Sequence, residues 1–250
     1  MAKFDRLSAL VERFALRVTP VENVQANLLI SDDRDSARAC RVVFCPTGPV
    51  QTDNSDGQPT AFGFLVSWGG AANPLLSALP DTVIYDTTDD PDMAGLIRLL
   101  RIEGEDRRCG SDTVLDRLGE VLMVRLLRTQ IERGATSTGI LGGLADPRLS
   151  RAIVAVHENP GKHWRSDDLA EIAGLSLSRF AELFVDVVGD TPMAYLRRWR
   201  MTLAHQDLQK GERVQTVARR YGYGSSEALN RSFRKQFGAS PKEVRMSANS

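Results

Sequence analysis

The last third of the chain contains two copies of one pattern, and this repeat constrains the fold more than any other feature. The segment LAEIAGLSLSRFAELFVDVVGDTPMAYL aligns with VARRYGYGSSEALNRSFRKQFGASPKEV. The turn glycines Gly174 and Gly222 lie 48 residues apart, and one residue gained in the turn makes later matches 49 apart: Phe184 with Phe233, Gly189 with Gly238, Pro192 with Pro241. Each copy predicts a helix-turn-helix followed by a further helix.

Helix signals in both copies support this prediction. In the first copy Ser176 is an N-cap candidate and Gly189 offers a left-handed stop. Between them Phe180, Leu183, Phe184 and Val187 recur at helical spacing, as Leu229, Phe233 and Phe237 do in the second copy. Each helix therefore has one apolar face for a core and one polar face for solvent or a partner.

The segment between the copies predicts one long helix. Thr191 is its N-cap, Pro192 its first helical residue and Gly211 its end. Its apolar side chains, expected to anchor both copies at a fixed separation, are Tyr195, Leu196, Trp199 and Leu203. Arg197, Arg198 and Arg200 on this helix are expected to bind main chain or acidic neighbours rather than DNA bases.

The region from Asp146 to Arg245 resembles the C-terminal DNA-binding domain of AraC/XylS-type transcription regulators. The resemblance lies in DLAEIAGLSLSRFAELF, PMAYLRRWRM and VARRYGYGSSEALNRSFRKQFGASPKEVR. It implies that the SLSRFAELF and SSEALNRSF helices enter successive major-groove segments of double-stranded DNA, about 34 Å apart. It also implies activation by recruitment of RNA polymerase.

Side chains on the outward faces of these two helices are the candidates for reading bases. In the second copy they are Glu227, Asn230 and Arg231, because Arg pairs with guanine, Asn with adenine and Glu with cytosine. Ser178, Ala181 and Glu182 hold the equivalent positions in the first copy. Glu182 stands where this family often has a basic or amide residue, so weaker base reading is expected there.

Other side chains on the same helices are better suited to phosphate. The candidates for contact with the DNA backbone are Ser176, Arg179, Ser226, Arg234 and Lys235. An ordinary solvated helix face is the alternative interpretation, and the repeated spacing argues against it.

Charge is divided unequally along the chain. The net charge is zero, yet residues 147–250 hold 17 Lys and Arg against 11 Asp and Glu, while residues 1–146 hold 15 against 21. An acidic half is therefore joined to a basic half, and only the basic half needs to meet phosphate.

The N-terminal half predicts a small antiparallel β unit with helices, so the fold class is α+β with an all-α C-terminal domain. A short helix is expected at residues 4–16, strands within ANLLI, CRVVF, TAFGFLVSW and DTVIYD, and helices at residues 92–102 and 111–133. GATSTGILGGLA then has a linker composition. The predicted domains are residues 1–134 and 146–247, joined by a linker at 135–145.

This half is similar to the cupin-type effector and dimerisation domain of many AraC-type regulators, through SWGGAANPLLSALPDTVIY and RRCGSDTVLDRLGEVLMVRLLR. The resemblance implies a homodimer and a small-molecule effector, whose binding residues the sequence does not identify. The N-terminal half has few residues from which the strands that normally begin the barrel could form, so an incomplete barrel is expected.

Neither a metal nor a cofactor is expected. Residues 1–156 contain no histidine, and His157, His163 and His205 all fall in the helical half, where packing or surface roles are the usual ones. Cys109, beside Arg107 and Arg108, is a candidate redox-sensing thiol, with incidental packing as the alternative. Cys40 and Cys45 point to opposite faces of one strand and are poorly placed to bridge each other.

Two other functions remain open beside a sequence-specific regulator. An enzyme has little support, because the chain has neither a Gly-rich phosphate loop nor a nucleophile elbow. The second alternative is a co-regulator or anti-activator that contacts proteins and binds DNA weakly. The charged N-terminus and the absence of a long apolar stretch favour a cytoplasmic protein without a membrane span.

Overall fold

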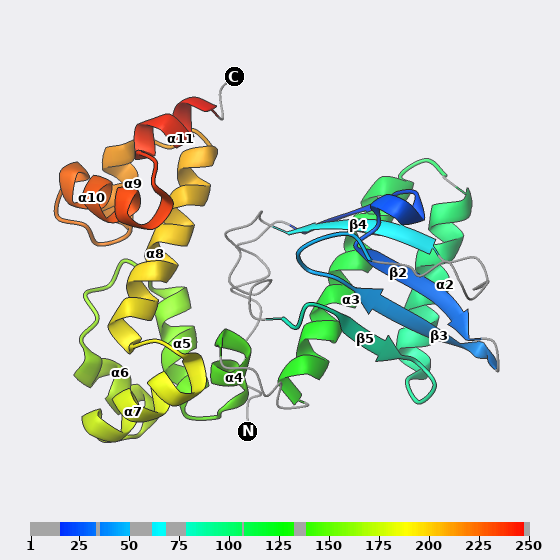
Figure 1. The fold of residues 1–250 in the computed structure, drawn as a ribbon, viewed down its shortest axis with the longest axis horizontal. Helices are drawn as coiled ribbons and strands as arrows, with labels where there is room; N and C mark the ends of the chain where they lie inside the picture. The colour runs from blue at the N-terminus through cyan, green and yellow to red at the C-terminus, as the bar shows by residue number, and fades with distance from the viewer. Residues whose placement is uncertain are drawn as a thin grey trace. The chain divides into compact units, whose positions relative to one another are not determined.

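The computed structural model describes residues 16–33, 36–50, 62–68, 79–106, 108–132 and 139–247. These residues form two compact units, one within Leu10–Ser137 and one within Thr138–Ser250. The first unit is a β-sheet with helices and the second is all-helical, as Figure 1 shows. The α+β class predicted from the sequence is confirmed.

The described strands of the N-terminal unit form one antiparallel sheet. Its strands are β1 (Leu16–Pro20), β2 (Leu28–Asp33), β3 (Ser36–Phe44), β4 (Phe62–Trp68) and β5 (Val83–Asp86), in the order β1-β4-β2-β3-β5. Leu28 pairs with Phe44 on one side and Phe64 on the other, which fixes the register of the central strand. Strands β2 to β5 overlap the four segments predicted as strands, and β2 and β3 extend beyond them, to Asp33 and from Ser36.

One face of this sheet carries the core. Phe64, Val66 and Trp68 alternate with exposed Leu65 and Ser67 along β4, as the two-residue period of a strand requires. Helices α2 (Pro91–Asp106) and α3 (Ser111–Glu132) pack on each other and on the sheet. Both helices were predicted, and the structure extends α2 at its C-terminal end.

Gly119 explains how closely α3 approaches the sheet. A Cβ atom at this position would lie 2.1 Å from a methyl group of Val18 on β1, so no larger residue fits without movement. The 3₁₀ turn η1 (Asn23–Gln25) then leads to Asn27, whose side chain exchanges two hydrogen bonds with the main chain of Val66. The buried amide of Asn27 is thereby satisfied.

Two predictions about the chain outside the repeat need correction. The expected helix at residues 4–16 lies outside the described residues except at Leu16, which begins β1, a strand that the sequence did not predict. The expected linker at 135–145 is wrong over Ile140–Ala145, which form helix α4. Ile140, Leu141 and Leu144 are buried, and α4 packs against α5 and α7, so burial outweighs the glycine-rich composition.

The C-terminal unit is built around one long helix. Figure 1 shows α8 (Pro192–Gln209) with α4 to α7 at one end and α9 to α11 at the other. The remaining helices are α5 (Leu149–Glu158), α6 (Ser166–Ala173), α7 (Leu177–Val188), α9 (Val214–Arg220), α10 (Ser226–Phe237) and α11 (Pro241–Ser247). The predicted pairs of helices and the helix between them are confirmed.

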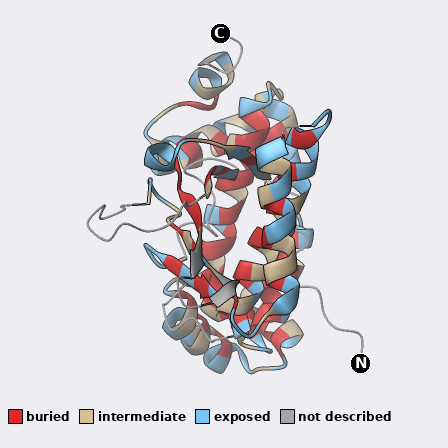
Figure 2. Ribbon diagram, turned by 90° about the vertical axis from the view of Figure 1, so that its right-hand side faces the viewer, coloured by how far each residue is buried: buried red, intermediate tan, exposed pale blue. Residues whose placement is uncertain are grey.

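Helix α8 is buried along most of its length, and Figure 2 shows buried positions recurring along the helices. Tyr195, Leu196, Trp199 and Leu203, the predicted anchors, are all buried. His157 on α5 lies against this row: its ring is 4.3 Å from that of Trp199, and Nε2 is 2.5 Å from the hydroxyl of Tyr195. The described helices include none that is both long and apolar enough to cross a membrane.

Candidate nucleic-acid interface

The two helix-turn-helix units begin and end their second helices in the same way. The hydroxyls of Ser176 and Ser225 accept hydrogen bonds from the amides of Arg179 and Ala228, which caps α7 and α10. Both helices are 12 residues long and end at a left-handed glycine, Gly189 or Gly238. The repeat in the sequence is therefore a repeat in local structure.

The second cap reveals a residue that the sequence analysis missed. Ser225, not Ser226, is the N-cap of α10 and the counterpart of Ser176, which lies 49 residues earlier. Ser226, a predicted backbone contact, is the first residue inside the helix and is half-buried. The offset of 49 residues was a usable signal, since it points from Ser176 to Ser225.

The two units are braced by a loop as well as by α8. Arg200 on α8 donates to the carbonyls of Pro160 and Lys162, in the loop between α5 and α6, at 2.6 and 2.7 Å. This loop brings Gly161 so close to the main chain of Arg220 that a Cβ atom would lie 2.2 Å from its carbonyl oxygen. The first unit thus contacts the turn of the second directly.

The outward face of α10 presents charged side chains to solvent. Glu227 and Arg231 are exposed one helical turn apart, as predicted. The pKa of Glu227 is held below its usual value by a hydrogen bond with Ser225, by the main chain and by the nearby Arg231. Arg234 and Lys235 are also exposed, where phosphate could reach them.

Asn230 differs from its charged neighbours. Its side chain is half-buried, and Oδ1 lies within the protein without a hydrogen-bond partner among the described residues. A two-pronged contact with adenine uses both the oxygen and the nitrogen of the amide. The side chain must therefore turn outward before it can read a base in this way.

The outward face of α7 is chemically different. Ser178 and Glu182 are exposed and Ala181 is half-buried. The carboxylate of Glu182 accepts a hydrogen bond from the guanidinium of Arg179, one turn earlier, and the two form an ion pair at 2.7 Å. The carboxylate at a predicted base-reading position and the guanidinium predicted to contact the DNA backbone are thus already paired with each other.

Comparison with known proteins agrees with this architecture. A helix-turn-helix domain model matches residues 169–247 and a cupin model matches residues 6–132, about half of the chain. The HTH-type transcriptional regulator AlkR of Acinetobacter baylyi is 33% identical over 178 residues, 69% of this chain and 58% of that protein. A putative AraC-like transcription regulator of Streptomyces lividans is 32% identical over 184 residues, 72% of this chain and 60% of that protein.

The chain belongs to the AraC-type regulators with a cupin N-terminal domain. It spans about 60% of the length of the curated relatives it matches. A solved structure, the DNA-binding domain of AdpA in complex with a target DNA, is 30% identical, with a TM-score of 0.38, and the match covers 41% of this chain and 92% of that one.

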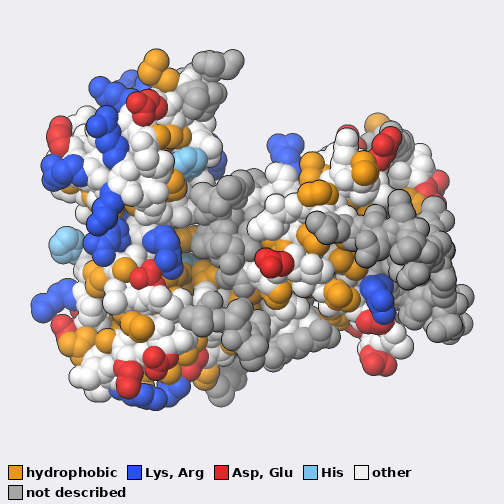
Figure 3. All heavy atoms as spheres, in the orientation of Figure 1, with side chains coloured by type: hydrophobic (Ala, Val, Ile, Leu, Met, Phe, Trp, Pro, Cys, Tyr) orange, Lys and Arg blue, Asp and Glu red, His pale blue; other side chains and the backbone are white. Residues whose placement is uncertain are grey.

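The two units of this AraC-type domain carry opposite charge. Between Arg165 and Gly189 there are five acidic residues and two basic ones, whereas between Arg213 and Gly238 there is one acidic residue and six basic ones. Figure 3 shows Lys and Arg side chains over the end built from α9, α10 and α11 and further along this helical unit. The basic excess predicted for the C-terminal half therefore belongs to its second unit.

Surface clefts on both sides of the α10 N-terminus point to basic residues that the sequence analysis did not select. One cleft, between α9, α10 and α11, is lined in part by Arg213, Lys242 and Arg245. The other, beside the turn before α10, is lined in part by Arg219. Because these side chains surround the helix that presents Glu227 and Arg231, they join the candidates for phosphate contact.

The histidines and cysteines of this AraC-type chain do not gather into a site. Among the described residues there is no group of three or more His, Cys, Asp or Glu placed to hold a metal ion. Cys40, Cys45 and Cys109 form no disulfide within the described part of the chain, and Cys109 is exposed in the turn before α3. Its neighbour Arg108 pairs with Asp106, and a redox role for Cys109 stays a prediction.

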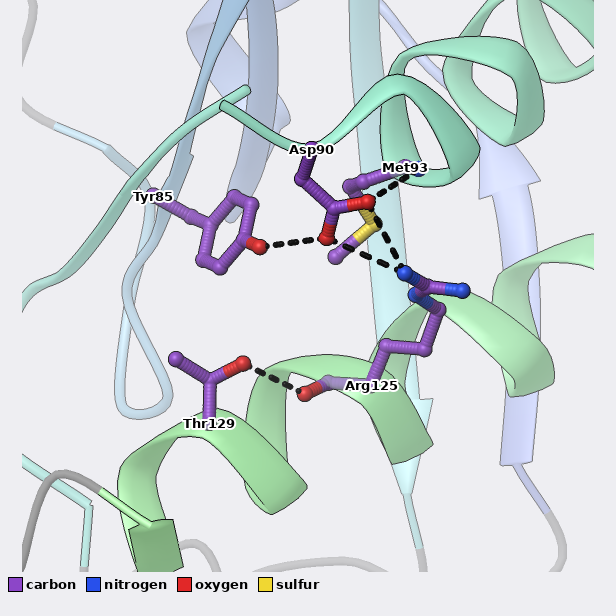
Figure 4. A network of polar contacts seen from close by, with 5 residues as sticks. All are labelled: Tyr85, Asp90, Met93, Arg125 and Thr129. Atoms are coloured by element: carbon purple, nitrogen blue, oxygen red, sulfur yellow. Dashed lines mark hydrogen bonds and ion pairs between the residues drawn. The ribbon is translucent and has the colours of Figure 1, made fainter. Parts of the chain in front are cut away.

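A polar network pins the two helices of the cupin unit to its sheet, as Figure 4 shows. Asp90 caps α2 by accepting from the amide of Met93, accepts from the hydroxyl of Tyr85 at 2.6 Å, and pairs through both oxygens with Arg125 on α3 at 3.0 Å. Burial alone would raise the pKa of Asp90, but the hydrogen bonds from Tyr85 and Met93 and the charge of Arg125 lower it. The network keeps this carboxylate ionised and holds α2, α3 and β5 together.

Proposed function

We propose that this chain is a sequence-specific, double-stranded DNA-binding transcription regulator, and an activator. The observation that carries the proposal is the pair of identically capped helices, α7 and α10, held at opposite ends of α8. The basic side chains of the second unit, above all Arg231, Arg234 and Lys235, supply the charge that phosphate requires. The named relatives are transcription regulators, which agrees with this function and with the absence of an enzymatic role.

The N-terminal unit is proposed to form a homodimer and to receive a small-molecule or redox signal. Its helices expose apolar side chains that a monomer would bury poorly: Val114 and Val121 lie two turns apart on α3, and Leu99 and Ile102 lie one turn apart on α2. Such a surface suits association with a second copy. RNA polymerase is the proposed partner at the promoter.

Selection from a random pool of DNA duplexes, followed by binding at several salt concentrations, tests the proposal. Fluorescence anisotropy with the selected duplex should show a dissociation constant that rises steeply with salt, because bound phosphates release counterions. A scrambled duplex should bind at least about 1,000-fold more weakly. Binding without sequence preference would favour the co-regulator alternative, which the acidic charge of the first unit supports.

A further inference from the structure

Three elements of the helical unit meet at the middle of α8. The guanidinium of Arg200 donates to the carbonyls of Pro160 and Lys162 in the loop between α5 and α6. A Cβ atom on Gly222, in the turn between α9 and α10, would lie 3.2 Å from Nη2 of the same guanidinium. Figure 1 shows the loop between the end that carries α6 and α7 and the end that carries α9 and α10. This junction therefore lies between the two helices proposed to enter DNA.

Positive side chains at the junction have no acidic partner. Lys162 and Arg197 are exposed, and neither forms an ion pair within the part of the chain that the structure describes. The ammonium of Lys162 lies 3.9 Å from the ring centroid of buried Trp164, which supports it at the surface. Arg198, the next residue of α8, pairs instead with Asp190 at 2.6 Å, as the sequence predicted. Two cations of the junction are thus not neutralised by a described carboxylate.

Tyr223 connects the junction to the candidate reading face of α10. Burial raises the pKa of its hydroxyl, whereas a hydrogen bond with Ser232 and the charges of Arg200 and Arg197 act in the opposite direction. The hydroxyl therefore lies near both guanidinium groups. Tyr223 also lines the cleft beside the α10 N-terminus, together with Glu227. The positive groups thus adjoin the reading face of the second unit and extend from it toward the first.

We propose that Lys162 and Arg197 form a third DNA-contact site, which binds the phosphates that border the minor groove between α7 and α10. Arg200 acts as a positioning residue, because it ties the loop that carries Lys162 to α8. This inference rests on the proposed function, which places α7 and α10 in successive major-groove segments. Along one side of a duplex a single minor groove separates two such segments, so its two backbones face the middle of the protein.

The chemistry of the site suits phosphate rather than base edges. The minor groove is about 6 Å wide and admits no helix, whereas a loop and the flank of α8 can reach its borders. Exposed ammonium and guanidinium groups bind phosphate oxygens whatever the sequence. The first unit needs such a contact, because it has five acidic and two basic residues between Arg165 and Gly189. The junction supplies positive charge that holds this unit against DNA.

The salt dependence of binding tests the proposal, measured by fluorescence anisotropy with the full-length protein and the selected duplex. Lys162→Ala and Arg197→Ala each remove one phosphate contact, so each should reduce the slope of log affinity against log salt by about 0.9. When salt rises fourfold, wild type should therefore lose about threefold more affinity than either variant. Base preference among single-substitution duplexes should stay as in wild type.

Arg198→Ala is the matched control, because it removes the same charge from the next residue of α8. Its guanidinium is already paired with Asp190, so the slope should stay within about 0.3 of the wild-type value. All three substituted side chains are exposed, so the fold is retained. Slopes for Lys162→Ala and Arg197→Ala that match the control overturn the proposal, and so does a change in their base preference.

Duplexes with neutral methylphosphonate groups locate the contact on the DNA. Replacement of the phosphates that border the central minor groove should weaken binding of wild type about tenfold, but that of the double variant Lys162→Ala with Arg197→Ala less than about twofold. Equal weakening of the two proteins overturns the proposal. Wild type that binds the selected and scrambled duplexes alike would count instead against the proposed function, so the two failures can be told apart.

Discussion

Arg200, in the middle of α8, donates to the carbonyl of Pro160 at 2.6 Å and so ties the loop between α5 and α6 to the long helix. The same guanidinium donates to the carbonyl of Lys162. Between these two residues Gly161 meets the main chain of Arg220, at the end of α9. The spacing of the two helix-turn-helix units thus depends on a loop contact as well as on α8.

Substitution of Gly161 by Ala should therefore weaken both stability and DNA binding. The added methyl group would lie 2.2 Å from the carbonyl oxygen of Arg220, and displacement of main chain costs about 1–3 kcal/mol of unfolding free energy. Chemical denaturation measures the loss. Gly224→Ala is the control, because no atom lies within 4 Å of its added Cβ. An equal loss of unfolding free energy in the two variants would show that the close contact between Gly161 and Arg220 is not the cause.

The buried carboxylate of Asp207 on α8 also holds the C-terminal end of α9 in place. It accepts from Arg220 at 2.5 Å and from the hydroxyl of Tyr221 at 2.6 Å. Asp207→Ala should lower the unfolding free energy by about 2 kcal/mol, because the buried hydroxyl of Tyr221 loses this acceptor. Glu212→Ala is the control: it removes only a half-exposed partner of Arg220 and should lower the unfolding free energy by less than about 1 kcal/mol. Similar losses of unfolding free energy in the two variants would refute the role of Asp207.

The sequence predicted the parts of the fold that local chemistry determines. Ser176, Thr191 and Gly189 take their expected capping positions, because caps depend on a few adjacent residues. Strand β1 and helix α4 were missed, because each is stabilised by distant partners: Leu16–Pro20 pair with β4, and Ile140 and Leu144 are buried in the helical unit. Local composition does not report such contacts.

The sequence predicted where the candidate interface lies, but not which of its side chains pair with each other. The repeat located the outward faces of α7 and α10, since helical spacing follows from the sequence. It did not reveal that Arg179 pairs with Glu182 or that Oδ1 of Asn230 is buried, because side-chain partners depend on rotamers and neighbouring helices. The loop contact between Gly161 and Arg220 joins segments about 60 residues apart, and the sequence did not predict it either.

His157 should make stability depend on pH. Burial lowers its pKa from 6.5 to about 3, so the unfolded chain binds a proton that the folded chain excludes. Stability should therefore be full above about pH 6.5 and fall as pH drops toward 3, by up to about 1.4 kcal/mol per pH unit from this group. In a His157→Asn variant the difference in slope from wild type should equal this contribution.

The control for this effect is Tyr195→Phe. It removes the hydroxyl that lies 2.5 Å from Nε2 of His157 but leaves the ring buried, so the pH slope should persist although stability falls by about 1 kcal/mol. Denaturation at several pH values measures both quantities. An identical slope in wild type and His157→Asn would show that the buried ring is not the cause.

Arg231 is the side chain on which base reading by α10 should depend most. It is exposed, and it lies one turn beyond Glu227, whose carboxylate is kept ionised by its hydrogen bond with Ser225. Arg231→Ala should cost about 1–3 kcal/mol of binding free energy and relax preference at one base pair, because a two-pronged contact with guanine is lost. Anisotropy with a set of single-substitution duplexes measures affinity and preference together. Gln236→Ala is the control: this residue lies on the same helix but outside the predicted reading face, so its substitution should change neither affinity nor base preference. If Arg231→Ala instead lowers affinity equally for all duplexes, Arg231 contacts phosphate rather than a base.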